Sequence, residues 1–383
     1  MKFDLVPPAS RAAADLDGLR REVRALLAEQ RSAGVFTPTV DSWGNGWNPE
    51  FSRALAERGW VGMTVPRQYG GGGRSFVERF AVTEELLAAG APVSAHWVAD
   101  RQVAPSLLRH GTDEQRARFL PPITRAEEFW AIGMSEPGSG SDLASVRTKA
   151  VPVEGGWIVS GTKLWTSGAH HAHFFIVLAR TAPTDPERRH EGLSQFIVPL
   201  DAPHVRISPV LNLSGEHHFN EVVLDEVYVP DGMLLGEPGT GWRQVTAELG
   251  FERSGSERFL STYALLAEAL REAGSGGIPS DPRLGALVGR HFGLHHMSLA
   301  VSQALERGDA ADIPAAVVKL LGTQMEGDVV DVVDELVGPS ERDASPVLAE
   351  FLRAGVLSRP GFTIRGGTTQ VLNGVVARGL GLR

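Results

Sequence analysis

Apolar residues recur every three or four positions in several long stretches of this chain, the spacing that gathers them on one face of a helix. The first stretch runs from residue 11 to residue 33 and sets Leu16, Leu19, Val23, Leu26 and Leu27 among charged residues. The same spacing predicts further helices over residues 51–57, 76–88, 94–109, 113–120, 242–273, 282–304, 314–336 and 346–357.

Residues 130–230 have a different pattern. Short runs rich in β-branched and aromatic residues, such as 156–160, 174–178 and 196–199, alternate there with Gly, Pro, Asn and Asp turns, which is typical of strands. We therefore predict an α+β fold. It has an N-terminal α-helical domain over residues 1–129, a middle antiparallel β domain over residues 130–232 and a C-terminal up-and-down helical bundle over residues 233–383.

Composition limits the partners. The 383-residue chain is long enough for several lobes with their own cores. Its formal net charge of −9 argues against a nucleic acid or an anionic membrane surface as partner. It has no cysteine, which excludes disulfides, a thiolate nucleophile and a Cys-ligated metal. The start of the chain lacks a signal-peptide pattern and no run reaches ~18 apolar residues, so we expect a cytoplasmic protein that does not insert into membranes.

Two motifs in the middle region point to chemistry. Residues 134–142 are Met-Ser-Glu-Pro-Gly-Ser-Gly-Ser-Asp, and residues 161–169 are Gly-Thr-Lys-Leu-Trp-Thr-Ser-Gly-Ala. The first is a turn rich in Gly and Ser that exposes backbone N–H groups, and the second carries an indole followed by two hydroxyls. Together they can hold a planar ring system that carries many hydrogen-bonding groups.

At this spacing the two motifs resemble the flavin-binding middle domain of acyl-CoA dehydrogenases. Residues 364–370 and 377–382 resemble the C-terminal signature of the same family, and residues 59–66 and 69–73 fit its N-terminal region. The resemblance implies an acyl-CoA dehydrogenase-like fold and an FAD-dependent oxidoreductase. Such an enzyme converts an acyl-CoA or acyl-carrier thioester into the trans-2-enoyl thioester and passes the electrons to an electron-transfer acceptor.

The resemblance also implies the flavin contacts. Trp165 would form the aromatic wall of the ring site, and the other cofactor contacts would be Met134, Ser135, Gly140, Ser167, Thr368 and Gln370. Serine stands at positions 135 and 167 where threonine is more usual, so hydroxyl chemistry is retained. Ser141 would face the pantetheine arm of the substrate. The structural alternatives are a core aromatic for Trp165 and a plain turn for the glycines.

The catalytic base departs from the commonest family pattern. The reaction needs a carboxylate that removes the α-proton of the thioester, and in many relatives it directly precedes the terminal Gly-Thr, where this chain has Gly366. Other relatives carry it on the first long C-terminal helix just before an arginine, and Glu252 precedes Arg253 here. Glu252 is therefore the candidate base, and Glu248 is the weaker substitute. An ordinary solvated Glu-Arg pair is the alternative.

Three further residues are candidate substrate contacts. The backbone N–H of Gly366 would donate to the thioester carbonyl and favour its developing negative charge. Arg253 matches the arginine that approaches the phosphorylated end of coenzyme A, although Gly250 replaces the usual aspartate three residues earlier. Trp97 is a candidate for the acyl pocket, with a buried core tryptophan as the equal alternative.

A cofactor clamp of the family is missing. Relatives usually carry Arg-x-x-Phe-Gly after the Glu-Arg pair, and it binds the FAD pyrophosphate of the neighbouring subunit. This chain has residues 274–279, Gly-Ser-Gly-Gly-Ile-Pro, at that place, and the later residues 290–293 have a different spacing. The pattern resembles a bacterial subgroup that shares FAD with a homologous partner subunit and often serves sterol catabolism. We therefore expect a tetramer, a dimer of dimers made of one or two kinds of chain.

Two rival functions stay open. A non-catalytic or half-site subunit of a heteromeric dehydrogenase would explain the missing clamp. A flavin-dependent N-hydroxylase of the same fold would need neither Glu252 nor Arg253. Several histidines lie close in sequence, but without carboxylate or cysteine neighbours at ligand spacing they predict strand and loop residues rather than a metal site. They are His170, His171, His173, His217 and His218.

Overall fold

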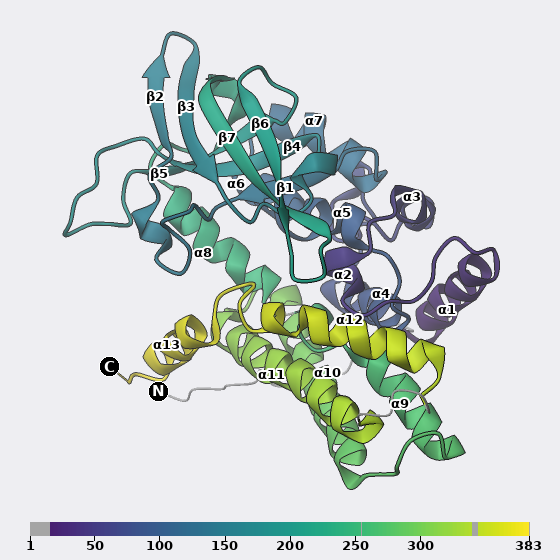
Figure 1. Cartoon of the computed structure of the whole chain (residues 1–383). Coiled ribbons are helices and arrows are strands. Elements are labelled where there is room, and N and C mark those ends of the chain that lie inside the picture. The colour runs from purple at the N-terminus through teal and green to yellow at the C-terminus, as the bar shows by residue number, and fades with distance from the viewer. Residues whose placement is uncertain (1–15, 254, 339–343, 383) are drawn as a thin grey trace. The chain divides into compact units, whose positions relative to one another are not determined.

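The computed structural model describes residues 16–253, 255–338 and 344–382, and gives the backbone alone for residues 249–252. The chain divides into two compact units. The sheet unit contains Pro49–Gly73 and Ala95–Leu249, and the helical unit contains Met1–Asn48, Arg74–Ser94 and Gly250–Arg383. The predicted order of helices, a central sheet and helices is confirmed (Figure 1). The predicted domain borders are a different division of the chain and stay a prediction.

The sheet unit is built on one sheet with the strand order β6-β7-β3-β2-β4-β5-β8, with β1 paired to β4. The strands are β1 (Trp130–Gly133), β2 (Lys149–Val153), β3 (Gly156–Lys163), β4 (Phe174–Arg180), β5 (Leu193–Pro199), β6 (Val205–Leu211), β7 (His217–Pro230) and β8 (Leu234–Leu235). Most strand pairs are antiparallel, as predicted, but the sheet is mixed, because β1 runs parallel to β4, as β2 does at one residue pair. A parallel pair needs a long crossover, and the chain from β1 to β4 supplies it through β2 and β3.

The helices of the sheet unit begin and end where the sequence offers caps. Thr112 caps α7 with a capping box that uses Gln115, which satisfies N–H groups that the first helical turn leaves free. The predicted helix 94–109 is present as Ser94–His110, with one π-helical turn inside it. The elements are α3 (Pro49–Glu57), η1 (Arg67–Tyr69), α5 (Ser94–Val98), η2 (Ala99–Val103), α6 (Ala104–His110) and α7 (Asp113–Thr124).

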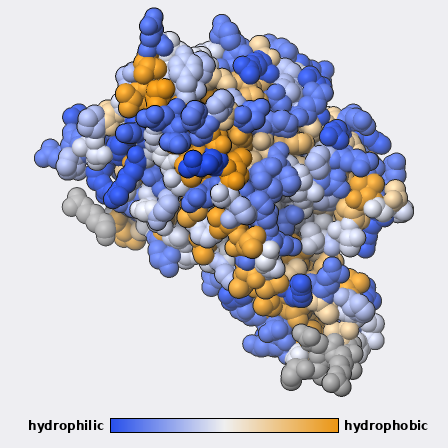
Figure 2. Space-filling model, turned by 45° about the horizontal axis from the view of Figure 1, so that its top comes forward, coloured by the Kyte–Doolittle hydropathy of each residue, from blue (hydrophilic) through white to orange (hydrophobic). Residues whose placement is uncertain are grey.

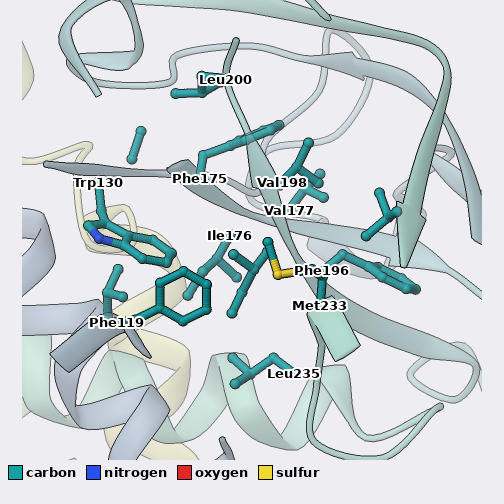
Figure 3. Packing of buried hydrophobic residues seen from close by; sticks show 14 of the residues in the cluster. Phe119, Trp130, Phe175, Ile176, Val177, Phe196, Val198, Leu200, Met233 and Leu235 are labelled. Carbon is teal, nitrogen blue, oxygen red and sulfur yellow. The ribbon is translucent and has the colours of Figure 1, made fainter. Parts of the chain in front are cut away.

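One apolar core joins these helices to the sheet (Figure 3). Phe119 of α7 meets the Trp130 ring edge to face, with ring centroids 5.1 Å apart, and Trp130 stacks on Phe174 at 5.0 Å. Such pairs contribute about 0.5–1.5 kcal/mol beyond the area that they bury. Strand β4 is buried along almost its whole length, so it reads as a continuous apolar run rather than an alternating one. This core anchors the strands that lead into both motifs.

The helical unit contains the long helices that follow the sheet (Figure 1). Its helices are α1 (Leu16–Ser32), α2 (Ser42–Asn45), α4 (Phe76–Ala88), η6 (Ser256–Arg258), α9 (Tyr263–Ser275), α10 (Pro282–Glu306), α11 (Asp312–Val337), α12 (Pro346–Phe362) and α13 (Thr369–Gly379). Helix α11 packs against α9, α10, α12 and α13. It is therefore the central helix of the bundle.

The predicted continuous helix over residues 242–273 is wrong. Helix α8 (Gly241–Glu252) ends, a short 3-10 turn follows, and α9 begins at Tyr263. Gly255 lies in this break, where an added Cβ would come within 1.9 Å of the Glu257 carboxylate. Ser and Gly favour such a break because both have low helix propensity. The helical spacing of apolar residues on either side of the break nevertheless predicted one continuous helix.

Hydrophilic side chains cover much of the face in Figure 2, and apolar side chains gather there in separate patches. Across the described residues, no helix is both long enough and apolar enough to cross a membrane.

Candidate functional site

The two middle motifs meet in the sheet unit, and each begins at or near the end of a strand. Residues 134–142 follow β1 and residues 164–169 follow β3. The Leu164 N–H donates to the Ser135 carbonyl at 2.9 Å. The first motif folds back on itself, since Glu136 and Ser139 exchange backbone hydrogen bonds of 2.7 and 3.0 Å. Sequence segments separated by a whole hairpin therefore form one structure.

A buried ion pair ties the two motifs together. The Lys163 ammonium donates to the Glu136 carboxylate at 2.8 Å and to the Met134 carbonyl at 3.1 Å. The Lys163 side chain is 0% exposed. The other contacts of the carboxylate are the backbone N–H groups of Arg147 at 2.7 Å and Thr148 at 2.9 Å. The interactions of this pair therefore join the end of β3 to the segment that follows β1 and to the segment that precedes β2.

The protonation states of the pair follow from these contacts. Burial lowers the pKa of Lys163 to about 8, against the opposing effect of Glu136. Burial also acts to raise the pKa of Glu136, but the Lys163 charge and the hydrogen bonds outweigh it, so this pKa lies below its ordinary value. Both groups are thus charged at neutral pH, and the pair is a true ion pair.

Trp165 is held in an unusual conformation. Its φ angle is +63°, a left-handed value that costs a non-glycine residue about 1–3 kcal/mol and is typical of functional sites. The indole is 53% exposed and meets the Phe219 ring edge to face at 5.5 Å. A tryptophan that is half exposed and contacts one aromatic ring is not part of the hydrophobic core. The structure therefore does not support the alternative that Trp165 is a core aromatic.

Asn220 of β7 holds the residue next to Trp165. The backbones of Asn220 and Thr166 exchange hydrogen bonds of 3.0 and 3.1 Å, and the Asn220 side-chain amide donates to the Thr166 carbonyl at 2.9 Å. The amide oxygen contacts His170 Nδ1 at 3.1 Å and His217 Nε2 at 2.7 Å. Because an amide oxygen only accepts hydrogen bonds, His170 carries its proton on Nδ1 and His217 carries its proton on Nε2. The histidines thus orient the asparagine that fixes the Trp165 segment.

The His170 ring of this cluster is uncharged at neutral pH. Burial, followed by the neighbouring His171 and His217, lowers the pKa of His170 to about 4, so its ring is neutral at pH 7. Within the described ranges, no group of three or more His, Asp or Glu side chains is arranged to hold a metal ion.

The remaining residues of the predicted flavin half-site surround this framework. Ser135 and Ser167 are partly exposed, and neither hydroxyl has a hydrogen-bond partner in the part of the chain that the structure describes. Gly140 and Ser141 are exposed, and a Cβ on Gly140 would meet nothing within 4 Å. An exposed indole, and two hydroxyls without a partner among the described residues in the two motifs that the Leu164–Ser135 hydrogen bond joins, fit a planar group with polar edges such as a flavin ring.

Trp97 lies elsewhere in the sheet unit, on α5. It is 5% exposed, and the Arg101 guanidinium lies over its ring at 4.8 Å. Its neighbour His96 is buried against the Ser52 hydroxyl at 2.8 Å, and burial lowers the pKa of His96 to about 4. These contacts favour the core alternative for Trp97, and its role in an acyl pocket stays a prediction.

The C-terminal motif belongs to the helical unit. Gly366 and Gly367 have φ angles of +69° and +96°, so a side chain at either position would be strained. Arg253 is buried and donates from Nε to the Gly366 carbonyl at 3.2 Å. Thr368 caps α13 by accepting from the Val371 N–H at 3.3 Å. The predicted residues of this motif are therefore close neighbours, while their ligand contacts stay a prediction.

The two candidate bases differ in what the structure says of them. Glu252 is the last residue of α8, but its side chain lies outside the described residues. Glu248, the weaker candidate, is buried and accepts hydrogen bonds from the Ser106 hydroxyl and, at 3.5 Å, from the Gln195 amide. These contacts bind Glu248 into the interior of the sheet unit, which favours a structural role for it.

The place of the missing clamp is the end of α9. Gly276 caps that helix in a left-handed conformation, with φ +82°. The two arginines that follow are engaged within the chain. Arg283 pairs with Asp281 and Glu335, and Arg290 pairs with Asp328 at 2.6 Å. Both cations are thus already matched by carboxylates of this chain.

Sequence reasoning missed the buried cations that organise both units. Lys163 lies in the motif of residues 161–169, but the motif does not indicate that its ammonium is buried and paired with Glu136. Lys319 lies within the apolar pattern of residues 314–336, and a lysine among buried positions of a helix was the available signal. Its ammonium donates to the Gly367 carbonyl at 2.6 Å.

The comparisons with known proteins agree with this arrangement. The acyl-CoA dehydrogenase N-terminal domain matches residues 14–127, and the middle domain of the same family matches residues 131–227. Acyl-CoA dehydrogenase IpdE1 of Mycobacterium tuberculosis is 34% identical over 388 residues, which cover 96% of this chain and 98% of that relative. Acyl-CoA dehydrogenase FadE34 of the same organism is also 34% identical, but the chain spans about half of its length, 49%.

Two solved structures are similar along the whole chain. One is described as the Tcur3481-Tcur3483 steroid ACAD, with a TM-score of 0.84, 29% identity and 100% of both chains covered. The other is the ChsE4-ChsE5 complex from Mycobacterium tuberculosis, with a TM-score of 0.81, 28% identity and coverage of 98% of this chain and 100% of that one. The chain therefore belongs to the acyl-CoA dehydrogenase family, whose enzymes are oxidoreductases that act on acyl-CoA and generally depend on FAD.

The ion pair between Lys163 and Glu136 should be essential to the sheet unit. Lys163→Met leaves a buried carboxylate without its cation, so we expect the free energy of unfolding to fall by about 3–5 kcal/mol, measured as a lower urea midpoint. Lys149→Met, at an exposed position of β2, is the matched control and should change it by no more than about 0.5 kcal/mol.

A double-mutant cycle tests the coupling directly. Lys163→Met with Glu136→Gln should lose less than the sum of the two single losses, because neither charge is then left alone. Additive losses would show that the two side chains do not act as a pair.

Proposed function

We propose that this protein dehydrogenates an acyl-CoA or acyl-carrier thioester between its α and β carbons, to the trans-2-enoyl thioester, with FAD as cofactor. The observation that carries the proposal is the Trp165 segment. Its indole is exposed on a strained backbone, the Ser135 and Ser167 hydroxyls have no partner among the described residues, and the buried Lys163–Glu136 pair holds the segment to the first motif. Family membership supports the same reaction class.

The residues of this chain have separate tasks in that reaction. Trp165 would cover one face of the flavin ring, and Ser135 and Ser167 would donate to its polar edge. Bound FAD supplies the hydride acceptor. Glu252 would take the α-proton, since Gly366 carries no carboxylate and its φ of +69° disfavours any side chain there. The Gly366 N–H would donate to the thioester carbonyl as negative charge develops on its oxygen.

The substrate we propose is a bulky acyl thioester of the steroid class. The support is that one similar structure is described as a steroid ACAD. The electron acceptor would be a separate electron-transfer protein.

We also propose that the active assembly is a heteromeric dimer of dimers that shares FAD with a homologous subunit. Both similar structures are described with paired names, as Tcur3481-Tcur3483 and as the ChsE4-ChsE5 complex. The chain's own features point the same way. A capped helix end stands where the pyrophosphate-binding arginine is usual, and carboxylates of this chain engage Arg283 and Arg290.

The same observations favour the half-site subunit as second candidate. Its discriminating residue is Glu252, because a subunit with no catalytic role has no need of a base on α8. The N-hydroxylase alternative has no support from the two curated relatives named above, FadE34 and IpdE1, which are both described as acyl-CoA dehydrogenases.

Trp165→Ala should remove or greatly loosen the flavin, because it deletes the proposed wall of the ring site. The measurement is flavin absorbance per subunit after gel filtration. Trp165→Phe keeps an aromatic face and should keep most of the flavin. Full absorbance at unchanged affinity in Trp165→Ala would place the flavin elsewhere.

Glu252→Gln should bind flavin but fail to be bleached by a thioester substrate under anaerobic conditions. The variant keeps the shape of the side chain and removes its basicity, which typically costs on the order of 10²–10⁴ in rate. Glu248→Gln is the matched control one turn earlier on the same helix, and it should still be bleached. Normal bleaching of Glu252→Gln would reject Glu252 as the base.

The chain expressed alone should hold less than one FAD per subunit. Each absent charge-assisted hydrogen bond to the pyrophosphate loses about 1.5–3 kcal/mol, which is tenfold or more in affinity. Coexpression with a homologous chain that carries Arg-x-x-Phe-Gly should raise the stoichiometry, measured together with the mass of the assembly. A catalytically competent homotetramer with one tightly bound FAD per subunit would contradict the partner proposal alone.

A further inference from the structure

The turn between α12 and α13 is restrained at three successive residues by three cationic side chains of the helical unit. The Arg365 guanidinium donates to Asp41 at 2.7 Å and to the Ser261 hydroxyl at 3.2 Å. It also lies 4.2 Å from the centre of the Trp43 ring. The next two residues are held by their carbonyls, Gly366 by Arg253 and Gly367 by Lys319.

Holding the carbonyls determines where the N–H groups point. In a trans peptide the C=O and the following N–H point in opposite directions, and the described chain has no cis peptide. The N–H groups of Gly367 and Thr368 therefore point away from Arg253 and Lys319, respectively. Among the described residues, the N–H groups of Gly366, Gly367 and Thr368 find no acceptor in the protein. Three successive donors are thus available to a ligand.

Lys319 is the most costly of the three cations. It lies in the middle of α11 with its side chain 0% exposed, among buried residues of the bundle core such as Ala315, Ala316 and Val318. Removing an ammonium from water is unfavourable unless strong partners replace its hydration. At 2.6 Å, its bond to the Gly367 carbonyl is a short charge-assisted hydrogen bond. A leucine would fill the same space without this cost.

We propose that Lys319 is a positioning residue for the thioester: by holding the Gly367 carbonyl, it fixes the peptide that carries the Thr368 N–H and, through that peptide, the turn in which the Gly366 N–H is presented to the thioester oxygen. This inference rests on the proposed function. Donors fixed in advance stabilise a developing oxyanion best, because no reorganisation is needed when the charge appears. The positive charge of Lys319 also favours negative charge on the thioester oxygen, because it polarises the Gly367–Thr368 peptide and makes the Thr368 N–H a stronger donor.

The order of the turn can be measured without any reaction. Thr369 donates its N–H to Thr363, and the N–H groups of Val371 and Leu372 are bonded to Thr368, so their amide hydrogen exchange reports the state of the turn. Lys319→Met should accelerate exchange at these three amides by about tenfold or more, and Lys319→Arg should restore much of the protection. Lys149→Met, at an exposed position of β2, is the control and should leave these amides unchanged. Unchanged exchange in Lys319→Met would overturn the proposal whatever the enzyme catalyses.

The catalytic arm uses the flavin-loaded protein, with its partner if one is required, and acyl-CoA thioesters that include a steroid side-chain acyl group. Lys319→Met should lower kcat, and the exchange of the substrate α-hydrogen with D2O, by about 10²–10³, with a smaller change in KM. Lys319→Arg should recover part of both rates, and the exposed Lys149→Met should match the wild type. If Lys319→Met does not fold, Lys319→Gln carries the same comparison.

The two arms separate failure of this inference from failure of the proposed function. Faster amide exchange with wild-type kcat per flavin-loaded subunit would make Lys319 a structural residue and overturn its positioning role. A wild-type protein that acts on no acyl-CoA thioester would reject the proposed function, and the positioning role with it. Slower α-hydrogen exchange, rescued by arginine, would support the assignment, because a purely structural defect does not discriminate between kcat and KM.

Discussion

The Lys163 ammonium is the contact on which the candidate flavin half-site depends. It is buried completely and binds Glu136 and the Met134 carbonyl. Its partner in turn holds the backbone of Arg147 and Thr148. A buried cation of this kind is stable only when all its partners are in place. Separating the two motifs would therefore leave a buried charge without its partner, so the pair favours the observed arrangement of the half-site.

The helical unit uses the same chemistry with a different partner. Lys319 and Arg253 bind backbone carbonyls rather than a carboxylate, so the cations restrain a turn of two glycines that has no side chains to hold it. Nearby, the Glu326 carboxylate accepts from the Ser261 N–H at 2.8 Å, and burial raises its pKa to about 7. Each unit thus contains a glycine-containing segment that buried charge holds in place. The glycines allow close approach of a ligand, and the cations remove the freedom that the glycines bring.

The backbone at Gly366 explains why this position carries no carboxylate, although many relatives have their catalytic base there. Its positive φ is compatible with glycine and unfavourable for glutamate, so the turn as it stands suits a donor of backbone N–H and not a base. The carboxylate then has to come from another element, and α8 ends with Glu252, next to Arg253, which binds the Gly366 carbonyl. The sequence places glycine at position 366 and the backbone there suits glycine, so both agree that this turn does not carry the base. The role of Glu252 as the base stays a prediction.

The sequence by itself determined the family, the order of helical and β regions, and most of the helices, because apolar periodicity and short motifs are local properties that survive without knowledge of contacts. It misplaced the break at residues 253–262, where apolar spacing continued across a turn, and it missed the parallel pairing of β1 with β4, since strand partners are not encoded by any one strand. Only the tertiary structure showed that Trp165 is exposed while Trp97 is buried. It alone brought Lys163 to Glu136 and Lys319 to Gly367, 27 and 48 residues apart along the chain. A buried charge is defined by its partners, and those partners come together only when the chain has folded.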